Sequence, residues 1–301
     1  MLSPFFLIPV LTRYLSPEEY GYVSIFTIMI SLAIPITGVN FSGAYSMAYF
    51  AEDRFDGPTY FGTVILGTLI IGSIMTVLAI ILCKPIGTLF SFPALWIWFV
   101  PVTASAKCIN DTILVHWQVR NNISYYGLFI NARTIFQAVM SIIFITIINL
   151  NWRGQIFAMV AAPLLFAPIG LIIMKHHSNI VFSIDKTYLK HALLFGAPLI
   201  PHALAGILNS SINRIFISKM VDVAEAGLYT VGFQLAGPIL LLAAAFNQAY
   251  VPWLFKRLML KSEKLNKTIV KITYLYFLII LLGSFILRNN GTFDVCIFYR
   301  K

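Results

Sequence analysis

Residues 57–83 read GPTYFGTVILGTLIIGSIMTVLAIILC and contain no Asp, Glu, Lys or Arg. The hydrocarbon core of a bilayer is about 30 Å thick and a helix rises about 1.5 Å per residue, so roughly 20 apolar residues suffice to cross it. The whole chain has this character, because 59% of its 301 residues are hydrophobic and only 11% are charged. A soluble fold needs more polar surface than that. The composition therefore predicts a membrane protein and excludes soluble enzymes and nucleic-acid-binding modules.

Long apolar segments recur along the chain, and continuous apolar runs without strict alternation favour helices over a membrane barrel. Residues 1–12 are apolar but would rise only about 18 Å as a helix, which is too short to cross. A signal peptide is disfavoured there, because no basic residue precedes the run and no small-residue cleavage site follows it. The sequence thus predicts an all-α polytopic membrane protein with a truncated first helix. We expect eight full spans, near residues 22–48, 59–83, 92–117, 124–149, 154–174, 191–212, 226–252 and 269–287.

The loops between these spans carry unequal numbers of positive charges. Assigning successive loops to alternate sides of the membrane gives eleven Lys and Arg residues on one side and six on the other. Because cytoplasmic loops are enriched in Lys and Arg, we expect the first side to be cytoplasmic. The dense cluster from Lys256 to Lys271 belongs to that side. It either lies against anionic lipid headgroups or is a solvated loop that only fixes the topology.

Two helix starts resemble each other at an offset of 206 residues. In RYLSPEEYGY, residues 13–22, Ser16 and Glu19 have capping-box spacing and Pro17 takes the first helical position. Six predicted spans separate this start from the second, so both lie on the same side of the membrane. This favours a parallel repeat of two bundles, as many transporters have, with chance similarity as the alternative. The matched pairs are Arg13 with Lys219, Glu19 with Glu225, Gly21 with Gly227, and Ser24 with Thr230.

Three ionisable residues fall inside predicted spans, where a charge is costly and normally faces protein or a water-filled cavity. Lys107 and Asp111 lie in the span 92–117, and Arg133 lies in the span 124–149. We expect them to line a hydrophilic pathway for an anionic solute, with Arg133 able to bind a phosphate bidentately. Alternatively, Lys107 and Asp111 pair with each other at i, i+4, which is the favoured interpretation for Asp111. The helix faces that carry them also carry Thr103, Asn110, Gln118, Gln137 and Ser141.

The second half of the chain supplies further candidates for the same pathway, namely Asn209, Arg214 and Gln248. His202 follows two prolines in a segment expected to be kinked, and we interpret it as a helix-packing histidine. The five histidines and three cysteines do not have metal-ligand spacing, and the chain contains no phosphate-binding loop. We therefore expect no catalytic site, no metal and no cofactor, and predict that the protein is not an enzyme.

Four parts of the chain follow a familiar order: PFFLIPVLTRYLSPEEYGYVSIF at 4–26, VRNNISYYGLFINARTIFQAVMSIIFI at 119–145, FGAPLIPHALAGIL at 195–208, and AEAGLYTVGFQLA at 224–236 with AFNQAYVPWLF at 245–255. Over residues 4–287 the sequence resembles the polysaccharide-biosynthesis flippases, the O-antigen and capsule exporters of the multidrug/oligosaccharidyl-lipid/polysaccharide flippase superfamily. The resemblance implies two six-helix bundles around a cationic cavity. It also implies a multi-pass protein of the bacterial inner membrane that moves undecaprenyl-diphosphate-linked sugar repeats outward by alternating access.

Under this resemblance the chain divides into an N-terminal bundle (1–175), a cytoplasmic inter-bundle loop (176–190), an incomplete C-terminal bundle (191–287) and an atypical tail (288–301). Two features depart from the family pattern. Asn213 and Arg214 stand where relatives commonly have Asp-Arg, so an ion pair there is lost. The family also continues with further helices where this chain has RNNGTFDVCIFYRK. We expect a fragment or a frameshifted product.

The implied partners are a lipid-linked oligosaccharide, anionic membrane lipids, and the polysaccharide polymerase and chain-length machinery, without nucleic acid. Three alternatives stay open: an inactive fragment of such a flippase, a multidrug or cation antiporter of the same superfamily, and a membrane glycan polymerase. The first helix start and the FGAPLIPH segment favour the sugar-lipid branch over the antiporter. The polymerase is disfavoured because no catalytic acid, metal site or large outward loop stands out in the sequence.

Overall fold

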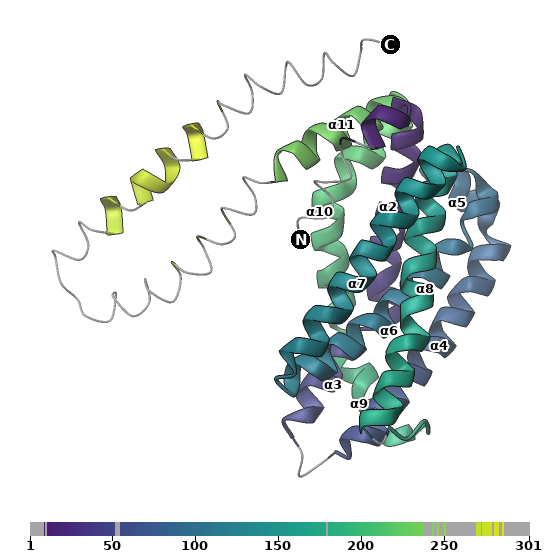
Figure 1. Cartoon of the computed structure of the whole chain (residues 1–301), viewed down its shortest axis with the longest axis vertical. Helices are drawn as coiled ribbons and strands as arrows, with labels where there is room; N and C mark the ends of the chain where they lie inside the picture. Colours follow the sequence, from purple (N-terminus) through teal and green to yellow (C-terminus); the bar gives the residue numbers. More distant parts are fainter. Residues whose placement is uncertain are drawn as a thin grey trace. The chain divides into compact units, whose positions relative to one another are not determined.

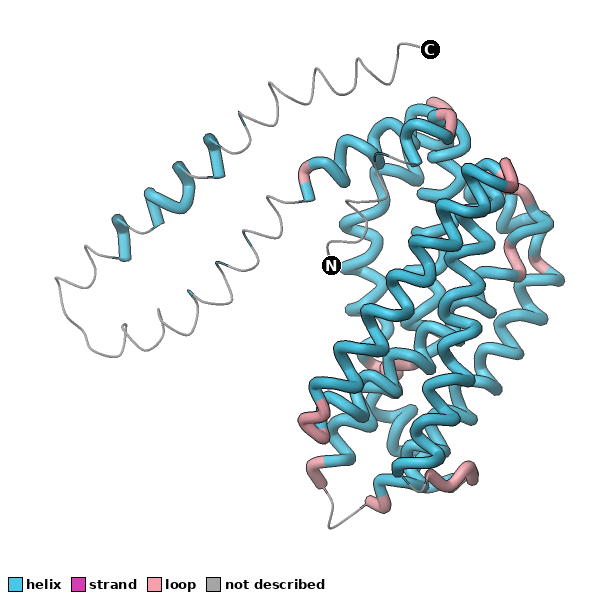
Figure 2. Tube along the Cα trace, in the orientation of Figure 1, coloured by secondary structure: helices cyan, strands magenta, loops and turns pink. Residues whose placement is uncertain are grey.

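The computed structural model describes residues 9, 11–51, 55–178 and 180–237, together with single residues and short runs between 243 and 285. Every regular element in these residues is a helix, which confirms the all-α fold class (Figure 2). The chain forms two compact units, Met1–Leu228 and Tyr229–Lys301. The division into bundles at residues 175 and 191 stays a prediction.

The first predicted span, 22–48, is two helices. α2 (Pro17–Gly38) starts with the predicted capping box, in which the Glu19 N–H donates to the Ser16 hydroxyl at 3.2 Å and the Ser16 N–H donates to the Glu19 carboxylate at 2.9 Å. Val39 and Asn40 then have φ values of 43° and 47°, and α3 (Phe41–Tyr49) follows. Two consecutive left-handed residues interrupt the helical hydrogen-bond pattern, and a hydropathy profile does not register such a change of dihedral angle.

The next helices follow the predicted spans more closely. α4 (Gly57–Ile81) is capped by Asp56, whose carboxylate accepts from the Thr59 N–H at 3.0 Å. The short helix α5 (Cys83–Phe90) and the 3₁₀ turn η1 (Ala94–Trp96) precede α6 (Phe99–Val119). The bend between α5 and the segment Ala94–Val119 is 114°. The break therefore lies between Phe90 and Ala94, and α5 does not extend α6 as one straight span.

The remaining elements of the first unit are also helical. α7 (Ile123–Ile142) continues into the π-helix η2 (Ile143–Ile147), and α8 (Asn151–Ser178) follows. α9 (Lys186–Gly196) and α10 (Leu199–Met220) form a pair that is bent by 42°. α11 (Val223–Leu235) begins 206 residues after the first residue of α2, and Asp222 accepts from the Glu225 N–H at 2.7 Å. The predicted correspondence of the two helix starts is thus confirmed.

Four described helices are long and apolar enough to cross a bilayer, or six elements if each of two bent pairs counts as one span. They account for the six predicted spans between residues 22 and 212, and the chain is a multi-pass membrane protein. The last two predicted spans, 226–252 and 269–287, are described only in part: α11 covers the start of the first, and the described residues between 269 and 285 in the second are helical. Among those that are described in the second unit, the rings of Phe246 and Tyr276 stack with centroids 4.3 Å apart.

α6 is the central helix of the first unit and contacts α2, α3, α4, α7 and α8 (Figure 1). Thr103, Ala104, Asn110 and Ile113 on this helix are fully buried. Because neighbouring helices surround it, α6 can carry polar side chains without exposing them to lipid. This arrangement explains how Lys107 and Asp111 are accommodated within a membrane-spanning segment.

Candidate functional site

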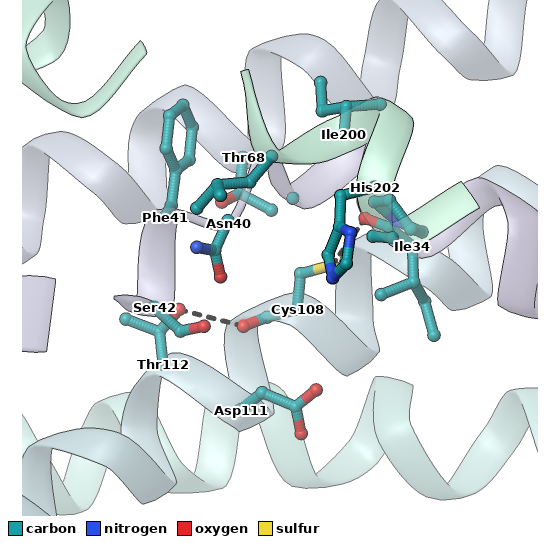
Figure 3. Close-up of a pocket in the computed structure, with 14 residues that line it drawn as sticks. Ile34, Asn40, Phe41, Ser42, Thr68, Cys108, Asp111, Thr112, Ile200 and His202 are labelled. Atoms are coloured by element: carbon teal, nitrogen blue, oxygen red, sulfur yellow. Dashed lines mark hydrogen bonds between the residues drawn. The ribbon is translucent and has the colours of Figure 1, made fainter. Parts of the chain in front are cut away.

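A cavity of about 350 Å³ lies in the first unit among α2, α3, α4, α6 and α10 (Figure 3). It is lined by the last turn of α2 and the first residues of α3, by Thr68 of α4, by one turn of α6 and by the first turn of α10. Two of these regions are interruptions of a helix, namely the α2–α3 break and the α9–α10 bend. Because interrupted helices commonly form the binding sites of transporters, the cavity is a candidate functional site.

The two interruptions pack directly against each other. Val39 is β-branched and has a positive φ, a conformation that such residues rarely adopt. Its carbonyl oxygen lies against Gly196, the last residue of α9, where any Cβ atom would collide with that oxygen. Only glycine permits this approach. The break in one helix and the bend in the other therefore hold each other in position beside the cavity.

Asp111 is the sequence-predicted site residue that the structure places in the cavity lining, and its side chain is exposed. The interpretation of His202 as a packing histidine is wrong, because His202 is exposed and lines the same cavity from α10. Proline removes a backbone N–H, and Pro198 and Pro201 here accompany a bend. The bend places the start of α10 at the cavity.

The polar residues of α6 do not form one wet face, contrary to the sequence-based expectation. Thr103 and Asn110 are fully buried, and the side-chain amide of Asn110 donates to the carbonyl of Pro163 in α8 at 2.9 Å. Lys107 is only partly buried and Asp111 is exposed. Asn110 therefore packs against α8, whereas the side chain of Asp111 is available to a solute.

Arg133 of α7 lies close enough to Lys107 and Asp111 to act electrostatically on both. Within the described residues, no ion-pair contact of 4.0 Å or less joins Lys107 to Asp111, so their predicted pairing is not formed as a direct bridge. The Nη1 atom of Arg133 is buried and has no hydrogen-bond partner in the described part of the chain. α6 and α7 thus place two cations and one carboxylate within electrostatic range of one another, with a guanidinium nitrogen left without a partner, and the role of the three residues as a site stays a prediction.

The other predicted site residues that the structure describes do not line the cavity. Gln137 is half-buried on α7, and its backbone carbonyl accepts from the Ser141 hydroxyl at 2.8 Å. Asn209 is exposed on α10, and Arg214 of the same helix donates to the Ser210 carbonyl at 3.4 Å. Gln248 lies outside the described residues. Membership of these four in the transport pathway stays a prediction.

Asn40 and Ser42 line the cavity and were missed by sequence reasoning. The span 22–48 was treated as one helix, although the segment GVNFSG at 38–43 places two glycines and an asparagine within six residues. Gly and Asn favour turns and left-handed backbone conformations. A turn signal inside an apolar run was therefore the clue that could have identified this part of the site.

Two of the histidines have structural partners. His116 shares a hydrogen bond of 2.6 Å with Tyr45, and His191 shares one of 2.9 Å with Tyr60. In the part of the chain that the structure describes, no three His, Cys, Asp or Glu side chains are grouped so that they could hold a metal ion.

Comparison with solved structures identifies a shared fold. The inward-facing conformation of a multidrug resistance transporter of the MATE family, within the MOP superfamily, superimposes with a TM-score of 0.68 and 17% identity over 95% of this chain and 70% of that one. At this level of identity the similarity concerns the fold alone.

Curated relatives come from Haemophilus influenzae. A protein of the Lsg locus is 24% identical over 268 residues, which cover 88% of this chain and 64% of the relative. A second membrane protein of that organism is 24% identical over 267 residues, covering 87% and 63% respectively. The chain thus spans less than two thirds of the length of these relatives. The model of a protein family described as polysaccharide biosynthesis protein matches residues 10–285, so the chain belongs to that family, as the sequence motifs predicted.

Proposed function

We propose that this chain translocates undecaprenyl-diphosphate-linked oligosaccharide repeat units across the bacterial inner membrane for O-antigen, capsule or exopolysaccharide synthesis. Family membership and the transporter fold support this assignment. Translocation by alternating access forms and breaks no covalent bond, so it requires binding groups and mobile helices rather than a catalytic residue. Anionic lipids, the polysaccharide polymerase and the chain-length machinery are its proposed partners.

The observation that carries this proposal is the unsatisfied guanidinium of Arg133. A buried donor without a partner destabilises a fold, and the penalty is larger for a charged group. An anionic ligand would supply the missing acceptor, and a guanidinium matches the geometry of a phosphate group. Lys107 lies within electrostatic range of Arg133 and would contribute a second positive charge. A diphosphate fits this pair, with the attached sugars extending into the adjacent space.

A cation antiporter is the second candidate, favoured by the exposed carboxylate of Asp111 and by the MATE transporter with the same fold. Two cations beside that carboxylate would repel a cationic drug, whereas they would attract a diphosphate. An inactive fragment and a glycan polymerase are the remaining alternatives. Failure of the unmodified chain to translocate either substrate would favour the fragment.

The proposal is tested by Arg133→Gln in the full chain, reconstituted in liposomes with a fluorescent undecaprenyl-diphosphate oligosaccharide. Translocation is followed by the protection of the label from a membrane-impermeant quencher. Hydrogen bonds to charged groups contribute about 1.5–3 kcal/mol, so we expect transport to fall roughly 10- to 100-fold. Arg133→Lys keeps the charge but not the bidentate geometry and should retain an intermediate rate.

Arg153→Gln is the matched control. Arg153 is exposed near the start of α8, where its guanidinium lies 5.7 Å from the ring centroid of Trp152. Its removal deletes the same charge from the side predicted to be non-cytoplasmic, which leaves the topological bias intact. Unchanged transport in Arg133→Gln, or an equal loss in Arg153→Gln, would contradict the role of Arg133. Transport of a cationic dye instead of the lipid would favour the antiporter.

A further inference from the structure

The cavity at the two helix interruptions contains polar groups that the fold itself does not use. The side chains of Asn40, Ser42, Asp111 and His202 line it, and in the described part of the chain none of them has a hydrogen-bond partner. Figure 3 shows Asn40 and His202 entering from different helices, with Asp111 on α6. Four polar groups that converge on one cavity without protein partners indicate a ligand.

The remaining polar residues of the lining differ from these four. The hydroxyl of Thr68 donates to the Val64 carbonyl at 2.9 Å, and that of Thr112 donates to the Cys108 carbonyl at 2.9 Å. The Cys108 thiol lies 3.6 Å from the carbonyl oxygen of Ile34, to which it donates. These groups are satisfied within the helices and present mainly their apolar atoms. Asn40, Ser42, Asp111 and His202 are therefore the polar groups of the lining that remain available to a ligand.

Asn40 is held in place by an unusual backbone. It precedes α3 with φ 47° and ψ 34°, and its side chain does not cap that helix. Asparagine tolerates the left-handed region better than most residues, but the conformation still requires support from the surroundings. Gly196 against Val39 provides that support. The strained break thus fixes a side-chain amide at the cavity instead of using it as a helix cap.

The chemistry of the four groups selects the class of ligand. Asp111 only accepts hydrogen bonds, whereas Asn40, Ser42 and a neutral His202 can both donate and accept. Among the described lining residues Asp111 alone carries a formal charge, whereas Arg133 and Lys107 lie outside the lining, so the cavity itself disfavours a free anion, and a metal ion would find a single carboxylate there. A pyranose ring has hydroxyl groups that donate and accept, and it has apolar C–H faces. Residues such as Pro35 and Ile200 provide apolar surface for those faces.

We infer that this cavity is a saccharide subsite that binds one uncharged sugar ring of the transported lipid-linked glycan, with Asn40, Asp111 and His202 contacting its hydroxyl groups. This inference rests on the proposed function, since the diphosphate is assigned to Arg133 and Lys107. It adds a specificity element, because the carboxylate of Asp111 favours a sugar that offers a donor and disfavours a sugar that carries a carboxylate.

The test measures binding of four lipids to the full chain in nanodiscs. The probes are undecaprenyl diphosphate without sugar, and the same lipid carrying one hexose, one N-acetylhexosamine or one hexuronic acid. The unmodified chain should bind one of the two neutral-sugar lipids about tenfold more tightly than the sugar-free lipid. Asn40→Gly preserves the left-handed backbone while removing the amide, and His202→Gln removes the imidazole. Both should abolish most of this tenfold preference and change the affinity for the sugar-free lipid less than twofold.

The control for Asn40→Gly is Asn121→Gly, the same substitution at another left-handed asparagine, with φ 54°, between α6 and α7. It should leave the sugar preference unchanged. Asp111→Asn should raise the affinity for the hexuronic acid lipid relative to the hexose lipid by about tenfold, because the repulsion between carboxylates is removed.

The outcomes separate this inference from the proposed function. If the unmodified chain binds the sugar-free lipid and gains nothing from any sugar, the subsite is excluded and the flippase proposal stands. A sugar preference that survives Asn40→Gly, His202→Gln and Asp111→Asn places the sugar elsewhere and also overturns the inference. If none of the four lipids binds, both proposals fail together.

Discussion

Two of the contacts that the region after residue 180 makes with the earlier helices are built in different ways. The first, the glycine crossing, consists of Pro17 and Gly21 of α2 with Val223 and Gly227 of α11. Gly21 lies against the carbonyl of Val223, and Gly227 lies against the carbonyl of Pro17. An offset of 206 residues converts Pro17 into Val223 and Gly21 into Gly227, so each glycine lies against the residue that corresponds to its partner's. Such reciprocity is typical of a two-fold relation between repeated units.

The second contact, the docked loop, joins residues 180–191 to the start of α4. The Thr63 hydroxyl shares its one proton between the Ser183 carbonyl at 2.9 Å and the Thr59 carbonyl of its own helix at 2.8 Å, and it accepts from the Asp185 N–H at 3.2 Å. The Tyr60 hydroxyl and the His191 ring share a hydrogen bond of 2.9 Å. Side-chain hydrogen bonds thus contribute directly to this contact. The docked loop also contains one close glycine contact, because a Cβ on Gly62 would overlap the Val181 carbonyl. The glycine crossing consists of such glycine contacts, so the loss of a side-chain hydroxyl should affect the docked loop and the gain of a methyl group should affect the crossing.

The largest effect is expected when the glycine crossing is broken by a methyl group. In Gly21→Ala or Gly227→Ala the new Cβ would overlap a backbone carbonyl, which cannot rotate away. Overpacking typically costs 1–3 kcal/mol, and because backbone is involved we expect about 3 kcal/mol for each variant, measured by denaturant unfolding in detergent. Reciprocity predicts similar losses for the two variants.

The double variant sharpens this prediction. Once one substitution has separated the helices, the second meets less resistance, so the combined loss should fall short of the sum by about 1–3 kcal/mol. Gly206→Ala in α10 is the matched control, since a Cβ there meets nothing within 4 Å. It should stabilise the helix slightly. Strict additivity, or a loss at only one of the two glycines, would contradict a reciprocal contact.

A smaller effect is expected at the docked loop. Thr63→Val keeps the shape of the side chain but leaves the Ser183 carbonyl and the Asp185 N–H without their hydroxyl partner. Unsatisfied buried groups cost about 1–3 kcal/mol, and because these two bonds are only part-buried we expect about 1.5 kcal/mol in the same unfolding measurement.

Thr76→Val is the control on the same helix, because the Thr76 hydroxyl bonds only the Gly72 carbonyl of α4, at 2.7 Å. Thr63→Ser retains a hydroxyl and should recover most of the loss. Equal losses in the valine variants at 63 and 76 would show that the docked loop does not depend on this hydrogen bond.

The two contacts also show what sequence reasoning could reach. Ser16, Pro17 and Glu19 identify the start of α2 because capping chemistry is local, and the same spacing locates the start of α11. The mutual approach of Gly21 and Gly227 could not be deduced, since it depends on where two distant helices cross. The docked loop was missed for the same reason. Thr63 looks like any other threonine within an apolar run.

From the sequence, residues of the candidate site could be predicted only where an ionisable side chain lies within an apolar span. Lys107, Asp111 and Arg133 stand out because ionised groups are rare within a bilayer, and the structure brings them close together. Asn40 and His202 carry no such signal. Their position follows from the break at Val39 and the bend before Leu199, which are backbone features that an average hydropathy cannot resolve.

The smallest expected effect distinguishes the two helix starts that form the glycine crossing. In α2 the Glu19 carboxylate also accepts from the Ser16 N–H, which completes a capping box; for α11 only the bond from the Glu225 N–H to Asp222 is found in the described residues. Ser16→Ala and Asp222→Ala should each cost about 1 kcal/mol, since each removes an N-cap. Both glutamates lie in the first turn of their helices, so their interactions with the helix dipole should be equal and should cancel in the comparison. Glu19→Ala also removes the bond from the Ser16 N–H, so it should cost about 0.5 kcal/mol more than Glu225→Ala. Equal losses of unfolding free energy in Glu19→Ala and Glu225→Ala would mean that the two helix caps are as symmetric as the glycine contacts. A larger loss in Glu19→Ala would confine the symmetry to the glycine contacts.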